Sequence, residues 1–233
     1  MRSERNPRQG CTFGNAAARS HRACVGLLLA AACVTSTGCL HSIVATGIYL
    51  WQGGNIVPAE CLDLEEHRVV VICRPPSSHE YRHAGAARAI GKQVSRLLEQ
   101  NVPGIDVVSP REVDNWIDEQ DWDNYKDLAR SVEAERILYI ELDGFELYKG
   151  KTLYQGDAIV TISVYDMNDR GRLIWDRNLG QVLFPRNSGV PVQDKPIGQF
   201  QNQFVEVVAS EIGRHFYEHD PNATFALDAI ANQ

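Results

Sequence analysis

The spacing of hydrophobic residues along this chain of 233 residues predicts mainly helices between residues 68 and 134 and mainly strands after that. Val69–Cys73 is a continuous apolar run, which is typical of a strand buried on both faces. From Ser78 to Gln100, apolar residues recur every three or four positions, which predicts a helix with one buried face. Residues 105–108 predict a short second strand, and two further helices are expected to begin at Pro110 and at about Asn124.

From residue 137 onwards the apolar positions alternate, which is the period of a strand with one buried face. Three strands are expected, over 137–148, 158–165 and 173–184, with turns at 149–151 and 168–171. A final amphipathic helix then places these side chains inward: Phe200, Phe204, Val205, Val208, Ile212 and Phe216. This order predicts a single α/β (α+β) domain, in which helices pack on a mixed, mostly antiparallel sheet of about five strands.

The N-terminal segment has the pattern of a secretion signal. Five arginines precede residue 23, an apolar stretch covers residues 23–34, and small residues follow it. Ser36-Thr37-Gly38-Cys39 resembles the lipobox of bacterial lipoproteins, except that Ser36 stands where leucine is usual. The resemblance implies that Cys39 is diacylated and becomes the first residue of the mature chain. Two or three acyl chains would then hold the protein firmly on a membrane.

The alternative is a helix that is never cleaved and spans the membrane over residues 23–51. This stretch carries no charged residue and exceeds the roughly 20 residues that a bilayer requires. Polar residues at 35–38 and 41–42 interrupt its middle, which favours the lipoprotein. In both cases the arginines stay in the cytoplasm, so the chain after Trp51 is expected on the extracytoplasmic side, at the outer membrane or in the periplasm.

The charge of the mature chain excludes some classes of partner. Because the first 39 residues contain five basic residues and one acidic residue, the remainder has 18 basic and 29 acidic residues and a formal charge of −11. Nucleic-acid binding requires a basic face, so no nucleic-acid partner is expected. An acidic chain has no electrostatic attraction for anionic lipid either, which leaves the lipid anchor to hold the membrane.

These patterns divide the chain into a lipoprotein signal peptide (1–38), a lipid-anchored apolar tether (39–66), the α/β domain (67–220) and a C-terminal tail (221–233). If Cys39 is acylated, Cys61 and Cys73 remain as a pair in a compartment where disulfides form. The sequence leaves open whether they form a disulfide or whether Cys73 is a small buried apolar residue.

The domain resembles a family of bacterial envelope domains that includes the curli-secretion lipoprotein CsgG, the amino-terminal domain of TolB and the lipoprotein activators of penicillin-binding proteins. The resemblance rests on the strand at 69–72, the helix from Ser78 to Gln100, the segment 107–113 and the strand–turn–strand of 163–175. It implies an anticodon-binding-like arrangement and a role in binding or scaffolding at the envelope, with a protein partner and compatible with an oligomer. It carries no catalytic signature, so neither an enzyme nor a cofactor is expected.

Two pairs of histidines are the candidate metal ligands. His79, Glu80 and His83 form an H-E-x-x-H sequence, in which two imidazoles on one helix face bind zinc and the glutamate acts as a general base. His215 and His219 are also four residues apart, and they would join the first pair if the last helix ran antiparallel to the first. Glu80 is also the expected partner of Ser77 in a capping box, and histidines suit the last turn of a helix, so the structural interpretation is favoured.

Two further segments are candidate binding elements. Trp116, Trp122 and Tyr125 lie among carboxylates that fail the calcium-loop template, and exposed aromatic residues of this kind suit a docking patch. The loop 185–196 contains Asn187 and Ser188 and is long for a compact domain, where such loops often bind ligands.

Overall fold

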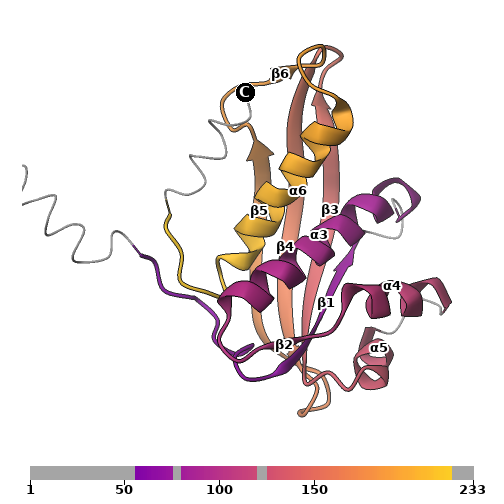
Figure 1. Ribbon diagram of the computed structural model, residues 1–233, viewed down its shortest axis with the longest axis vertical. Helices are drawn as coiled ribbons and strands as arrows, with labels where there is room; N and C mark the ends of the chain where they lie inside the picture. Colours follow the sequence, from indigo (N-terminus) through magenta and orange to yellow (C-terminus); the bar gives the residue numbers. More distant parts are fainter. Residues whose placement is uncertain (1–55, 76–79, 120–124, 222–233) are drawn as a thin grey trace, which may run out of the picture. The chain divides into compact units, whose positions relative to one another are not determined.

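The structure is a computed structural model that describes residues 56–75, 80–119 and 125–221. In chain order its elements are β1 (Arg68–Arg74), α3 (Glu80–Asn101), β2 (Asp106–Val107), α4 (Pro110–Glu119), α5 (Tyr125–Ser131), β3 (Arg136–Lys149), β4 (Leu153–Asp166), β5 (Arg172–Phe184), β6 (Val190–Pro191) and α6 (Ile197–Gly213). The predicted fold class is confirmed, because four helices pack on a mixed sheet of six strands in this part of the chain (Figure 1).

The sheet has the strand order β2-β1-β3-β4-β5, and the two-residue β6 pairs with the start of β4. β1 runs parallel to both of its neighbours, and the β3–β4 and β4–β5 pairs are antiparallel hairpins. Pairing between β1 and β2 is limited to Arg68↔Asp106 and Val69↔Val107, whereas β1 pairs with β3 over six residues. Beyond Val69, β1 therefore has a strand neighbour on one side only, that of β3, among the described residues.

The continuous apolar run of β1 is explained by its two covered faces. Val69, Val71 and Cys73 point into the core beneath α3 and α6, and Val70 and Ile72 point into a smaller core beneath α4 and α5. Successive side chains of a strand point to opposite faces, so a strand between two helical layers needs apolar residues throughout.

The last helix supplies the largest buried side chains. All six of its predicted inward residues are buried, although Phe216 follows the end of α6 rather than lying within it. The Phe204 ring packs on Phe145, with 5.0 Å between ring centroids. Gly156 of β4 lies directly below, where an added Cβ would come within 2.5 Å of the Phe204 ring. Glycine is therefore required at this position for α6 to reach the sheet.

The predicted tether, residues 39–66, ends inside the domain, because residues 56–66 pack against the rest of it. Cys61 and Leu64 are buried in the core beneath α3 and α6. The main chain of Val57 exchanges two hydrogen bonds with that of His219, and the Cys61 amide donates to the His215 carbonyl. No helix of the described residues is long and apolar enough to cross a membrane.

Candidate binding cleft

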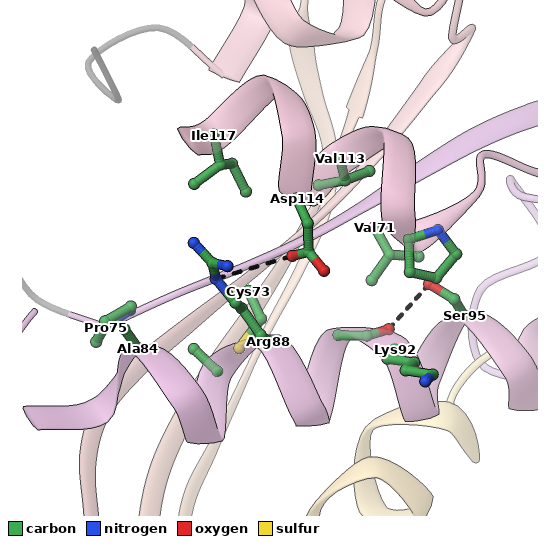
Figure 2. Close-up of a pocket in the computed structure, with 13 residues that line it drawn as sticks. Val71, Cys73, Pro75, Ala84, Arg88, Lys92, Ser95, Val113, Asp114 and Ile117 are labelled. Carbon is green, nitrogen blue, oxygen red and sulfur yellow. Dashed lines mark hydrogen bonds and ion pairs between the residues drawn. The ribbon is translucent and has the colours of Figure 1, made fainter. Parts of the chain in front are cut away.

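A cleft of about 390 Å³ lies between α3 and α4, above the carboxyl end of β1 (Figure 2). Its floor is formed by Val71 and Cys73 of β1. Ligands of α/β sheets commonly bind at the carboxyl ends of parallel strands, and clefts of roughly 300–1,000 Å³ are typical of ligand sites. We call this site the α3–α4 cleft.

The two helices form apolar walls of the cleft, and the side chains on the two walls differ in size. Small residues at three- and four-residue spacing, Ala84, Ala87 and Gly91, face it from α3. Val113 and Ile117 face it from α4. The short side chains on α3 bring this helix close to β1, since a Cβ on Gly91 would lie only 3.6 Å from the Cys73 Cβ.

Charged side chains lie at the rim. Arg88 of α3 reaches across to α4, where its guanidinium lies 3.9 Å from Asp114 (Figure 2). The guanidinium also hydrogen-bonds to the Asp118 carboxylate. The hydrogen bond to Asp118 is the main cause of the raised pKa of Arg88, so this cation persists at all physiological pH values. Because the pair is exposed, we expect it to contribute only about 0–1 kcal/mol to stability. Lys92, on the same rim, forms no ion pair with a described residue.

The sequence left open whether Cys61 and Cys73 form a disulfide, and in the structure both are free, buried cysteines. Cys73 packs against Gly91 in the middle of α3, whereas Cys61 is bonded to the segment that follows α6. Burial raises the pKa of Cys61 to about 12, and it also raises the pKa of Cys73.

Both thiols are therefore expected to resist alkylation in the folded chain, because only the thiolate reacts. Iodoacetamide at about pH 8 should label neither Cys61 nor Cys73 before denaturation and both of them after it. Mass spectrometry of the labelled peptides measures the result. Thiols that stay unlabelled after denaturation without a reducing agent would contradict it, since that is the behaviour of a disulfide.

The two histidine pairs do not converge in the way that a four-imidazole site requires. In Figure 1, α3 and α6 run side by side in the same direction, so the end of α6 lies by the end of α3 and not by its start. His83 is buried near the start of α3 with its ring against Phe145, and His79 lies outside the described residues. His215 and His219 lie beyond the end of α6, and His219 is part of a β-bridge. No group of three potential ligands that could hold a metal ion occurs among the described residues.

His215 instead belongs to an ion-pair cluster with Glu60 and Arg177. Its Nδ1 lies 3.1 Å from the Glu60 carboxylate, which also accepts hydrogen bonds from Arg177. Burial raises the pKa of Glu60, but the hydrogen bond from Arg177 and the interactions with His215 outweigh it, so the net shift is downward. Burial also lowers the pKa of His215, and Glu60 offsets this only in part.

These shifts predict a loss of stability in mild acid. An unfolded chain takes up a proton on His215 below its ordinary pKa of about 6.5, whereas the folded chain resists that proton. The stability contributed by His215 is thus complete above that pH and is lost as the pH falls. We expect the free energy of unfolding, measured in urea, to fall from about pH 7 to pH 5, and to fall less in His215→Phe. An equal fall in both proteins would contradict this explanation.

The remaining predicted binding residues lie elsewhere. Trp116 is on α4 but packs half-buried against the smaller core, and Trp122 lies outside the described residues. Tyr125 is half-buried against the smaller core, where its ring packs on Tyr139 and Tyr165, and burial raises its pKa to about 12.

The loop 185–196 carries β6, which the sequence did not predict. Asn187 and Ser188 are exposed there, away from the cleft, and the Ser188 carbonyl accepts a hydrogen bond from Gln155.

Sequence reasoning missed the residues of the cleft because none belongs to a recognised motif. The available signals were the small residues of α3 and the short length of the second strand.

No family model matches this chain, and no curated protein matches it. Solved structures similar to it include a dodecameric PelC variant from Paraburkholderia phytofirmans, with 13% identity, a TM-score of 0.40 and coverage of 68% of this chain and 96% of that one. Lipoprotein GNA1162 from Neisseria meningitidis has 12% identity, a TM-score of 0.39 and coverage of 63% of this chain and 98% of its own. A minor lipoprotein from Acinetobacter baumannii has 12% identity, a TM-score of 0.31 and coverage of 63% of this chain and 89% of its own. Bacterial lipoproteins are thus among the structural neighbours, and the resemblance to the CsgG and TolB family stays a prediction.

Proposed function

We propose that this protein is a lipoprotein, anchored to a membrane outside the cytoplasm, whose single domain binds an envelope protein through the α3–α4 cleft without catalysing a reaction. The sequence supports the location through the positive leader, the apolar stretch and Cys39. The role in envelope assembly or maintenance follows from the sequence resemblance.

The α3–α4 cleft is the observation that carries the binding role. It combines an apolar floor and apolar walls with a few charged groups at the rim, which is the usual composition of a ligand site. Cys73, the thiol on the floor of the cleft, is kept protonated by burial, and Arg88, one of the two cations at the rim, is hydrogen-bonded to Asp118. The Ser95 hydroxyl donates its hydrogen bond to the Gly91 carbonyl rather than to a base, which supports a binding role.

Cross-linking in intact cells tests this role. A photo-activated amino acid in place of Ala84 faces the cleft, and the same amino acid in place of Gly85 is the matched control, because Gly85 is exposed with no neighbour within 4 Å of its Cβ. We expect the first position to capture a protein of one defined mass and the second position to capture much less of it. Equal capture from both positions, or no capture from position 84, would rule out the cleft as the binding site.

A zinc-dependent hydrolase that uses His79, Glu80 and His83 is the competing function. Metal analysis of the purified full chain distinguishes the two. Zinc at one equivalent, together with a hydrolytic activity that is lost in His79→Ala, would overturn the binding role.

A structural protein held by an uncleaved helix over residues 23–51 is the second alternative. It differs from the lipoprotein in the N-terminus of the mature chain.

A further inference from the structure

We propose that the ligand of the α3–α4 cleft is an extended peptide segment of the partner protein, which pairs with the open edge of β1 as an additional strand. This inference rests on the proposed function and specifies what the cleft recognises.

The hydrogen bonds around β1 show which of its residues face the open edge. The carbonyls of His67 and Val69 accept bonds from Asp106 and Val108, at 3.0 and 2.9 Å, on the side of β2. The Arg68 carbonyl accepts a bond from Glu135 on the side of β3. The backbone groups of alternate residues in such a strand point to opposite neighbours, so those of Val71 and Cys73 point to the side of β2.

Beyond Val69, this side of β1 has no strand partner within residues 56–75, 80–119 and 125–221. β2 ends at Val107 and the chain enters α4 at Pro110. No hydrogen bond joins a described residue to the groups of Val71 and Cys73 that point this way, although the two residues are only 4% and 8% exposed. More than 90% of buried backbone N–H and C=O groups in proteins are paired. The floor of the cleft therefore presents donors and acceptors that require a partner.

The unpaired backbone groups of β1 favour an extended chain over a helix. The N–H and C=O groups of a helix are bonded within the helix, so they cannot pair with those of Val71 and Cys73. A strand placed beside β1 needs a spacing of only about 4.8 Å and turns its side chains alternately to the two walls. Addition of a strand to an exposed sheet edge is a recurring mode of peptide recognition, in which main-chain bonds supply affinity.

The walls and the rim define the chemistry of the segment. Ala84, Ala87 and Gly91 on one wall and Val113 and Ile117 on the other accommodate small apolar side chains. Lys92 has no ion-pair partner among the described residues and is placed to bind one carboxylate at the rim. The segment is thus expected to be apolar with one acidic residue.

The test uses the capped peptide acetyl-Ala-Val-Ala-Val-Glu-amide and the isotope-labelled mature chain. Saturating peptide is expected to slow hydrogen exchange of the Val71 and Cys73 amides by about tenfold or more, because each gains protection from a strand neighbour. The amides of Val70 and Ile72, which point toward β3, serve as internal controls and are expected to change little. No slowing at about 1 mM peptide, or slowing confined to other regions, would overturn the proposal.

A methylation scan of the peptide tests the strand directly and leaves the protein unchanged. Methylating one peptide nitrogen at a time is expected to weaken binding by about tenfold at every second residue and much less at those between, because only alternate N–H groups bond to β1. An equal effect at all positions would overturn strand pairing.

The two experiments separate this inference from the proposed function. Capture from position 84 without protection of Val71 and Cys73 overturns strand pairing alone, whereas absence of capture overturns the binding role itself.

Discussion

Replacing Phe204 by alanine is expected to lower the free energy of unfolding by about 3–5 kcal/mol, a loss at the upper end of what single core substitutions cause. Phe204 is fully buried, and its ring lies between those of Phe145 and Phe184, at centroid distances of 5.0 and 6.5 Å. Truncation removes the transfer free energy of the ring and leaves a cavity that the rigid sheet beneath it fills poorly. Urea denaturation of the purified chain measures the change.

Ile197→Ala is the matched control, because Ile197 lies at the start of the same helix with 41% of its surface exposed. We expect a change within about 0.5 kcal/mol there. Similar losses in the two variants would contradict the core position of Phe204 and, with it, the packing of α6 on the sheet.

Replacing Cys39 by serine is expected to abolish attachment of fatty acid. The resemblance to a lipobox implies that the sulfur of this residue carries the lipid, and a hydroxyl has no comparable nucleophilicity. Cells grown with labelled palmitate should therefore incorporate label into the wild-type protein and none into Cys39→Ser.

Cys33→Ser is the control for this experiment, since Cys33 lies in the preceding apolar stretch and has the same side chain. It should retain the label. Absence of label from the wild-type protein as well would contradict lipidation and favour the uncleaved helix.

The periodicity of the sequence was sufficient for the fold class because each element has one clear pattern. The continuous run of β1 required two covered faces, and the alternation after residue 136 required hairpins with one buried face. The segment 56–66 has no such period. Leu64 is buried by contacts with distant parts of the chain, which local spacing does not encode.

The candidate site was harder to predict from the sequence than the fold class. The α3–α4 cleft exists because β2 pairs over two residues only, and the length of a pairing depends on where the following helix packs. Whether the two histidine pairs could meet was open for a similar reason, because the direction of α6 relative to α3 is set by the path of the chain around the sheet. Residue spacing showed which side chains share a helix face, but it contained no information on which helix ends meet.

The mass of the mature N-terminal peptide tests the central claim most directly, since the lipid anchor decides where the cleft meets its partner. Protein extracted from membranes is digested, and the N-terminal peptide is identified by mass spectrometry. We predict a peptide that begins at Cys39 and carries the added mass of its acyl chains. A peptide that begins at Met1 would show that no lipoprotein signal was removed and would contradict the lipoprotein.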